Sequence, residues 1–580
     1  MGLGFKEVVV LRPIRFVIPA LALVLAASQT LAGSAGPIPT NLRVTHDNST
    51  GGGYVSADQM AGGTYTDGVL TRCGTDKRQQ NEPTLAIDPR NPLVRTSGSN
   101  DYCAIPTNHD AWAGFYRSVD GGVNWTDSLL PGYALDTSAQ GTASPVHQMA
   151  LGGAIAAGDP VQAWDHSGNL FFMGNNFNRG IEDGISASFR DNTGDVWVAT
   201  YAAADPSKSL TDGSHYVRTV ILASNTFGQG SFNDKTGIQV DQSNGNVYAA
   251  WSDFHGRGCN EIVLSRSTDH GATFSAPMKI SSVCNNQGPN IAIGPSGQVY
   301  VSWFANTGGT KSLGSNFSEG AAFASSNDGG QTFSKATIAV PFNPFVSSQF
   351  SGNGARDCGD GALACPTGQT FPRFDLAQPS IVTSGKVIVM AFQVALANGQ
   401  GQAQFTKSID GGATWSRPAA IDSQAKGHQF FPWITAANNR LSAVYYDSRL
   451  DPNYSPTVAP CNDSHGNGYA CLGVWYSTST DGGATWSHQE LTSALTNPNY
   501  EQFGGRLVPF FGDYIMVSAV GNSIEAVWTD ARDVVAAPGP DGNDPAGDPH
   551  AGGACFSTTA NNCFDLSGGL DQNIYTANIS

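Results

Sequence analysis

A tyrosine, an aspartate and an arginine stand close together in the segment YYDSR at residues 445–449. A phenol acts as a nucleophile only when a nearby carboxylate takes up its proton, and Tyr446 directly precedes Asp447. The guanidinium of Arg449, two residues further on, suits a bidentate contact with an anionic group. We therefore predict that Tyr446 and Asp447 are catalytic and that Arg449 binds substrate.

Two glutamates extend the set of predicted catalytic residues. Glu501 lies five residues before Arg506 in YEQFGGR, which pairs a carboxylate with a guanidinium, and Glu82 stands directly before a strand-like segment. Other polar side chains border the predicted strands, and those expected to bind substrate are Arg257, Arg373, Arg506, Arg532, His428, Asp253 and Asp530. The positions equivalent to that of Glu82, ahead of the other inner strands, are Asp159, Lys235, Asn290, Arg373 with Asp375, His428 and Asp513.

A structural interpretation of two of these segments stays open. Asp447-Ser-Arg449 and Asp530-Ala-Arg532 repeat one pattern at separate places in the chain. An ion pair within each pattern would order a loop, and structural ion pairs are a common alternative to functional sites. The repetition favours this interpretation.

The elements that must position these residues are short β-hairpins. Seven segments alternate Val, Ile, Tyr or Trp around a turn, a pattern typical of two antiparallel strands. They cover residues 84–101, 161–176, 237–253, 290–306, 380–393, 433–449 and 516–532. The 69 Gly and 31 Pro, with only 13% charged residues, favour many strands and turns over long helices. We therefore predict an all-β chain.

A second pattern, Ser-x-Asp-x-Gly-x-x-aromatic, occurs five times. Its copies begin at Ser118, Ser267, Ser326, Ser408 and Ser479. The aspartate can accept hydrogen bonds from backbone N–H groups of a turn, and the glycine can take a left-handed conformation. We expect these aspartates to stabilise turns and not to catalyse.

The spacing of this box predicts the number of repeats. Asp120 and Asp269 are 149 residues apart, whereas the later intervals are 59, 82 and 71 residues. The long interval spans two units, so we expect the unit at 161–176 to have lost its box, with 191–197 as a remnant. The last unit has three strands, and segment 41–47 can supply the fourth. We predict a β-propeller of four-stranded blades, seven in number with six as the alternative, closed by this N-terminal strand.

The five boxes resemble those of the sialidase superfamily, also described as BNR or Asp-box repeat proteins. The resemblance covers most of the chain after residue 32 and implies a β-propeller, but the superfamily includes glycosidases, lyases and binding proteins. Its sialidases also carry an Arg-Ile-Pro motif, three arginines that clamp the substrate carboxylate, a Tyr–Glu nucleophile pair and an Asp acid/base. The Arg-Ile-Pro motif does not occur here after residue 32.

The first 32 residues are expected to be an export signal. Lys6, Arg12 and Arg15 precede an apolar stretch at 16–27 that is short for a membrane span, and an uncleaved anchor is the alternative. Ten cysteines, an even number, fit an exported chain with disulfides. We expect sequence neighbours to pair: Cys73–Cys103, Cys259–Cys284, Cys358–Cys365, Cys461–Cys471 and Cys555–Cys563. The expected location is extracellular or periplasmic.

Residues 33–580 are expected to form a single Asp-box propeller domain that is monomeric. A net charge of −17 disfavours nucleic acid as a partner, and no later segment is apolar enough to insert into a membrane. The expected partner is a glycan or glycoconjugate. No cofactor and no metal in the site are expected, although the acidic loop at 541–550 could hold a structural calcium ion without matching an EF-hand.

Two functions are compatible with these features. The first is hydrolysis of glycans by a secreted, sialidase-like exo-glycosidase. The second is a non-catalytic propeller that binds glycan or protein, with both Asp–Arg patterns ion-paired and no carboxylates at the separation of about 5–10 Å that glycosidases use. The absence of the Arg-Ile-Pro motif after residue 32 and the scarcity of glutamate favour the binding propeller. The usual function of proteins with this fold favours the exo-glycosidase, which we adopt.

Overall fold

The computed structural model describes residues 1, 36–47, 53–75, 79–104, 111–178, 193–202, 215–225, 231–255, 259–282, 285–306, 319–342, 378–456, 460–461, 470–497, 511–533 and 571–579. Residues 36–580 form one compact unit, separate from residues 1–35. Its described strands make seven antiparallel sheets of four strands each. The predicted all-β propeller with seven blades is confirmed, and the alternative of six is wrong.

Each of the first six blades follows chain order from its inner to its outer strand. Blade 1 consists of β2 (Gln80–Ile87), β3 (Arg95–Asp101), β4 (Trp112–Ser118) and β5 (Thr126–Leu129), and blade 2 of β6 (Ala156–Trp164), β7 (Asn169–Asn178), β8 (Thr193–Ala202) and β9 (His215–Ala223). Blade 3 consists of β10 (Ser231–Val240), β11 (Val247–His255), β12 (Cys259–Ser267) and β13 (Met278–Lys279), and blade 4 of β14 (Asn286–Ile293), β15 (Val299–Asn306), β16 (Glu319–Ser326) and β17 (Thr337–Phe342). Blade 5 consists of β18 (Ser380–Ser384), β19 (Val387–Ala395), β20 (Gly401–Ser408) and β21 (Ala419–Ala420), and blade 6 of β22 (Gln429–Ala437), β23 (Arg440–Asp447), β24 (Gly473–Ser479) and β25 (Ser487–Glu490).

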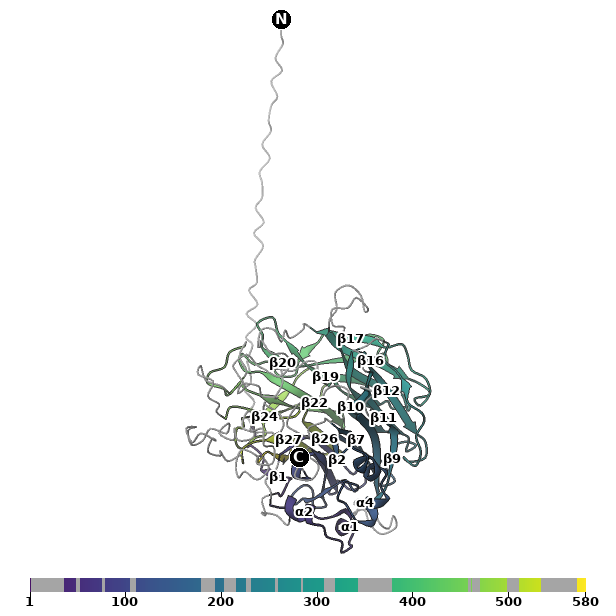
Figure 1. Cartoon of the computed structure of the whole chain (residues 1–580). Coiled ribbons are helices and arrows are strands. Elements are labelled where there is room, and N and C mark those ends of the chain that lie inside the picture. The colour runs from purple at the N-terminus through teal and green to yellow at the C-terminus, as the bar shows by residue number, and fades with distance from the viewer. Residues whose placement is uncertain are drawn as a thin grey trace. The chain divides into compact units, whose positions relative to one another are not determined.

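The seventh blade joins the two ends of the unit. Its strands are β26 (Met516–Val520), β27 (Ser523–Asp530), β28 (Asn573–Asn578) and β1 (Asn41–Arg43), with β1 as the outer strand beside β28. In Figure 1 the purple β1 accordingly lies next to the C-terminal end. The predicted closure by an N-terminal strand is confirmed, and it covers an edge that would otherwise be open to pairing.

Charged side chains fasten this closing segment on both sides. The Arg43 guanidinium contacts Asp47 and lies 3.1 Å from Asp571 and 3.4 Å from Asp533. His46 Nδ1 lies 3.2 Å from Asp127, which belongs to β5 of the first blade. The segment therefore ties blade 7 to blade 1 through ion pairs as well as through backbone pairing.

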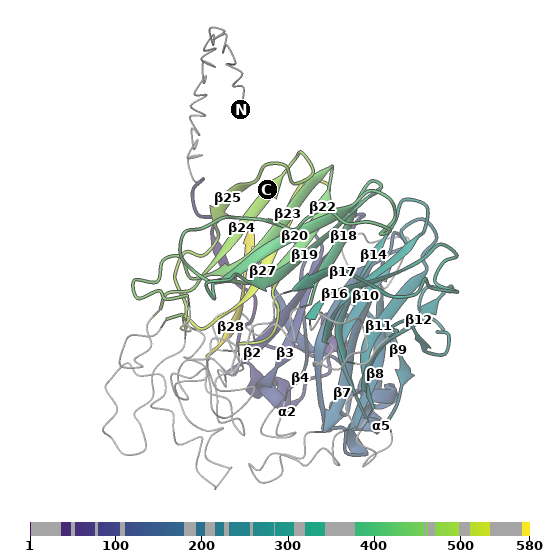
Figure 2. The same cartoon turned by 90° about the horizontal axis from the view of Figure 1, so that it is seen from above.

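Apolar side chains fill the spaces between neighbouring blades. Separate buried clusters lie between blades 3 and 4, 4 and 5, 5 and 6, and 6 and 7, and a larger one joins the first three. Figure 2 shows the sheets packed face against face in chain order. Both faces of a blade are thus covered, which explains why its central strands have so few exposed positions.

The five Asp boxes form the hairpins between third and fourth strands. In the box of blade 5, Ser408 Oγ donates to Asp410 Oδ1 at 2.8 Å and accepts from Gly412 N, while Thr414 N donates to the same carboxylate at 2.9 Å. Trp415 then packs edge-on against Phe323 of blade 4, with ring centroids 5.1 Å apart. The predicted turn role is confirmed. The expected remnant at 191–197 is wrong, because Thr193–Ala202 is the third strand β8 and not the hairpin after it.

Substituting the two glycines of that box by alanine should have different effects. Both have positive φ, 74° at Gly411 and 92° at Gly412, so each substitution carries a backbone cost of about 1–2 kcal/mol. A Cβ at Gly411 meets nothing within 4 Å, whereas one at Gly412 would come within 2.1 Å of Phe323 Cε1. We expect Gly412→Ala to lower the unfolding free energy by a further 1–3 kcal/mol or so. Equal urea midpoints for the two variants would contradict this.

Few helices interrupt the sheets. α1 (Ala57–Met60), α2 (Gly68–Cys73), α4 (Ala139–Ala143), α5 (Pro145–Leu151) and the 3-10 turn η1 (Tyr102–Ala104) are short. α1, α2 and α4 lie together beside the first blades in Figure 1. Among the described residues, no helix has the length and apolar character needed to cross a membrane.

Two of the expected disulfides are confirmed. Cys73 is bonded to Cys103, and Cys461 to Cys471. Each of the remaining three expected pairs includes at least one residue outside the described part of the chain. The acidic loop at 541–550 also lies outside it.

Candidate functional site

The inner strands surround a central channel and share a distortion where they begin. In blades 1, 2, 3, 4 and 6 the pairing of the first two strands is interrupted by a bulge. The bulged residues of four of these blades have positive φ although they are not glycine: Glu82 (55°), Asp159 (51°), Lys235 (48°) and Phe431 (53°). Such conformations cost about 1–3 kcal/mol each and gather at functional sites.

Three of the bulged side chains meet in one buried cluster with a fourth residue. The Lys235 ammonium lies 3.2 Å from Glu82 Oε1, 3.4 Å from Asp159 Oδ1 and 2.8 Å from Asp513 Oδ2. These residues come from blades 3, 1, 2 and 7, and all four are buried. One lysine therefore holds together carboxyl groups from three other blades.

The environment separates the proton affinities of these carboxyl groups. Burial raises the pKa of Glu82 well above its usual value, outweighing the attraction of Lys235. For Asp159 burial acts in the same direction, but Lys235 and hydrogen bonds from the Asp234 and Glu82 side chains outweigh it, so the Asp159 pKa is lowered. Burial and the Asp159 charge raise the pKa of Asp234. Glu82 and Asp234 therefore hold a proton more tightly than Asp159 does.

Asn100 of β3 connects two of the bulges. Its Nδ2 donates to Glu82 Oε2 at 2.8 Å and to Asn81 Oδ1 at 3.1 Å, and its Oδ1 accepts from the Asp159 backbone N–H at 2.8 Å. A Cβ on Gly158 would lie 2.5 Å from Asn100 Oδ1, so glycine is needed there. The amide therefore orients the Glu82 carboxyl group relative to Asp159.

Tyr446, predicted as a nucleophile, lies in the core of blade 6. Its ring stacks on Phe430 with centroids 5.3 Å apart, and its hydroxyl donates to the Thr529 carbonyl at 2.7 Å. Burial, with a smaller contribution from the Asp530 charge, raises its pKa well above the usual value. Both the packing and the hydrogen bond hold the phenol in its neutral form.

The two Asp–Arg patterns are ion pairs. Arg449 Nη2 lies 2.5 Å from Asp447 Oδ2 and 2.5 Å from Asp422 Oδ2, and its guanidinium stacks over the Trp475 ring at 3.6 Å. In blade 7, Arg532 Nη2 lies 2.6 Å from Asp530 Oδ2. The structural interpretation of these patterns is confirmed by the distances.

Of the other predicted site residues, the structure describes His428 and Asp253. His428 is buried and accepts from Gly401 N at 3.1 Å through Nδ1, and Asp253 lies near the end of β11, paired in register with Glu261. Glu501, Arg257, Arg373 and Arg506 lie outside the described residues. Of the catalytic set, the structure places Tyr446 and Asp447 side by side in β23, and Glu82 alone in the cluster around Lys235.

Asn100 and Asp234 were not predicted as members of the cluster. The sequence does mark the position of the bulges, because proline directly follows the bulge position in four blades, at Pro83, Pro160, Pro289 and Pro432. Proline lacks the N–H that would pair there, so its recurrence at one place in the repeat marks interrupted pairing. Aligning the repeats on these prolines brings Glu82 and Asp159 into register with Gly288 and Phe431.

Comparison with known proteins finds similarity among solved structures alone. No protein-family model and no curated protein matches the sequence. Among solved structures, the Hadza microbial sialidase Hz136 is 12% identical over 76% of this chain and 72% of its own, with a TM-score of 0.38. The Trypanosoma rangeli sialidase is 14% identical over 77% and 59%, with a TM-score of 0.38. The Penicillium chrysogenum α-L-arabinanase is 11% identical over 79% and 100%, with a TM-score of 0.39.

The fold is a seven-bladed β-propeller. Its four-stranded blades and the five boxes at their outer hairpins are properties of this chain's own structure. In this propeller the boxes and the cluster around Lys235 belong to opposite ends of the strands, since the boxes follow the ends of third strands and the cluster lies where inner strands begin. The residues that identify the fold are therefore not those of the candidate site.

The propeller should become more stable as the pH falls from about 8 to about 5. Burial raises the pKa of Asp47 to about 7 and that of Asp101 to about 6, and the pKa of His46 is also raised, where the hydrogen bond to Asp127 outweighs burial. Unfolded carboxyl groups titrate near pH 4 or so, so the folded state binds more protons in this window. The associated stability is complete below about pH 4 and is lost as the pH rises through 6 and 7.

Calorimetric Tm values at pH 8, 6.5 and 5 measure this effect. Asp47→Asn should reduce the rise in Tm between pH 8 and pH 5, because an amide does not titrate. Asp269→Asn, in an exposed box whose carboxylate has its pKa lowered to about 2 by hydrogen bonds from Thr273 and Ser267, should leave the slope unchanged. A Tm that falls between pH 8 and pH 5 would refute the prediction.

Proposed function

We propose that this chain is a carbohydrate-active hydrolase that cleaves glycans or glycoconjugates outside the cell by exo-glycosidase-like chemistry. The observation that supports this most is the cluster of bulged residues around Lys235, in which Glu82 and Asp159 both contact the ammonium while burial raises the pKa of Glu82 and the pKa of Asp159 is lowered. Cleavage of a glycosidic bond needs a carboxylic acid to protonate the leaving oxygen and a carboxylate to balance the positive charge of the transition state. Pairs of acids with separated pKa values are how one site provides both.

In this proposal Glu82 donates the proton and Asp159 is the carboxylate. Asn100 and Lys235 are positioning residues, since they orient these two groups by hydrogen bonds and charge. Arg449 and Arg532 stabilise blades 6 and 7 and do not clamp substrate. The resemblance of the boxes to those of the sialidase superfamily supports a glycan as the substrate class.

Glu82→Gln tests the assignment with little change in shape. The amide keeps a donor toward Asp159 and an acceptor toward Asn100 but cannot deliver a proton, so kcat/KM should fall by about 10²–10⁴-fold. The measurement uses fluorogenic glycosides, including a sialoside and an arabinoside, with Tm as a check on folding. Glu490→Gln, a half-buried carboxyl group on β25 of blade 6, is the matched control and should retain activity.

Variants in blade 6 distinguish the two predicted sites. If Tyr446→Phe and Asp447→Asn abolish turnover while Glu82→Gln does not, catalysis belongs to blade 6 and the assignment to Glu82 is wrong. Turnover by Glu82→Gln equal to that of the native chain would also exclude it.

A binding propeller is the second candidate. Both arginines nearest the predicted nucleophile are engaged in ion pairs, and the cluster around Lys235 is buried, which suits a structural role. Absence of turnover on every glycoside, together with binding on a glycan array that Glu82→Gln leaves intact, would favour this second function.

A further inference from the structure

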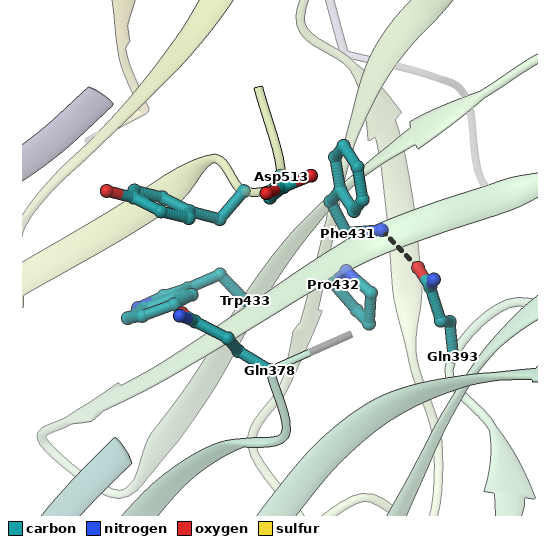
Figure 3. A pocket seen from close by; sticks show the side chains of 7 residues that line it. Gln378, Gln393, Phe431, Pro432, Trp433 and Asp513 are labelled. Atoms are coloured by element: carbon teal, nitrogen blue, oxygen red, sulfur yellow. Dashed lines mark hydrogen bonds between the residues drawn. The ribbon is translucent and has the colours of Figure 1, made fainter. Parts of the chain in front are cut away.

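A small cavity lies beside the cluster around Lys235, between blades 5, 6 and 7. Its volume is about 10 Å³, and Figure 3 shows the side chains around it: Gln378, Gln393, Phe431, Pro432, Trp433, Asp513 and Tyr514. One water-sized particle needs roughly this volume. The cavity can therefore hold a single small ligand.

One oxygen of Asp513 has no partner in the described structure. The side chain is 3% exposed, and its Oδ2 lies 2.8 Å from the Lys235 ammonium. Asp513 lines the cavity, and its buried Oδ1 has no hydrogen-bond donor among the described residues. Leaving a buried carboxylate oxygen without a donor or a cation is strongly unfavourable, so the free oxygen indicates a ligand.

The charge balance of the cluster indicates the sign of that ligand. The Lys235 ammonium supplies one positive charge and faces three carboxyl groups, those of Glu82, Asp159 and Asp513. Three acids therefore share one base in a buried site. A water molecule could donate to Asp513 but would add no positive charge.

The lining indicates a weakly hydrated ion with a single charge. The rings of Trp433 and Tyr514, with centroids 6.3 Å apart, and of Phe431 offer faces that attract cations. Divalent calcium takes six to eight oxygen ligands or so, and no group of three acidic, histidine or cysteine side chains suited to a metal occurs among the described residues. The amide groups of Gln378 and Gln393 add neutral oxygens.

We propose that this cavity binds one potassium or ammonium ion, held by Asp513 Oδ1 and the amide oxygens of Gln378 and Gln393, the latter of which also accepts from the Phe431 backbone N–H at 2.7 Å. Trp433 also lines the central channel, a cavity of about 410 Å³ bounded by the inner strands. The site neutralises the cluster around Lys235 and fastens blade 7 to blades 5 and 6. It does not depend on whether the propeller is an enzyme.

Thermal unfolding of the native chain in different salts at one ionic strength is the first test. Chlorides of potassium, ammonium, sodium and N-methylglucamine are compared. A ligand that binds only the folded state raises Tm in a saturable way, and we expect a rise of about 2–4 °C in potassium or ammonium over N-methylglucamine. Asp513→Asn should abolish that difference, whereas the same change at the exposed box residue Asp269 should preserve it.

Rubidium soaked into crystals of the native chain gives a test that needs no variant to fold. An anomalous peak next to Asp513 Oδ1 between the two glutamine side chains is expected. A water molecule there with no anomalous signal, or equal Tm values in all four salts, would overturn the proposal. Either result leaves the activity assigned to Glu82 untouched, because that activity is measured separately with glycosides.

Discussion

Replacing Lys235 with methionine is expected to lower the free energy of unfolding by about 3–5 kcal/mol. The substitution keeps most of the side-chain volume but removes the ammonium group that lies 2.8 Å from Asp513 and 3.4 Å from Asp159. Both carboxylates then stay buried without their counter-charge. Breaking a buried pair by removing one partner is far more costly than replacing both partners.

Lys279→Met is the matched control for this variant. Lys279 also contacts a carboxylate, that of Glu261, but its side chain is 47% exposed, so its loss should cost about 1 kcal/mol or less. Urea unfolding followed by tryptophan fluorescence measures both variants. Similar midpoints for the two would mean that the cluster does not hold the inner strands together. If the loss of unfolding free energy caused by Lys235→Met disappears at low pH, protonation of the neighbouring carboxyl groups replaces the missing counter-charge.

Replacing Arg43 with methionine is expected to weaken ring closure, by about 3–5 kcal/mol at pH 8. Arg43 is the cation among Asp47, Asp571 and Asp533, and it lies in the three-residue strand that completes blade 7. Without it, the carboxylates repel one another across the junction of the chain's two ends. The backbone pairing of β1 with β28 is short, so the side chains carry much of the closure.

The size of this effect should depend on pH. Burial raises the pKa of Asp47 to about 7, so near pH 5 this carboxyl group is protonated and needs no counter-charge. The loss caused by Arg43→Met should therefore be smaller at pH 5 than at pH 8. Arg440→Met, whose guanidinium contacts the Asn522 carbonyl at 3.4 Å, is the control and should show a small loss that is the same at both values. An equal loss for Arg43→Met at both pH values would contradict the role of Asp47.

The architecture of this protein could be predicted from local sequence patterns. Alternation of apolar residues defines strands, and the Ser-x-Asp-x-Gly box stabilises a turn through hydrogen bonds among residues two to four positions apart. Because the local pattern repeats, counting its copies gives the number of blades. Closure by residues 41–47 followed from the same counting, because the last unit lacked one strand.

The candidate site could be predicted only in part. Glu82, Asp159, Lys235 and Asp513 were recognised as equivalent positions before or within inner strands, but their contact depends on bulges that turn the side chains of separate blades toward one another. The prominence of Tyr446 came from its neighbours in the chain. Its hydroxyl instead points across blades to Thr529, 83 residues away.

Local repeats by themselves determined the strands, the boxes, the number of blades and the paired Asp–Arg patterns of this chain. Each of these features depends on residues close in sequence, so a short segment is enough to determine it. Only the tertiary structure decided which charged groups share a buried site, in which direction burial shifts their pKa values and which oxygen of Asp513 has no hydrogen-bond donor. Those properties depend on burial and on distances between blades, and no single segment contains either.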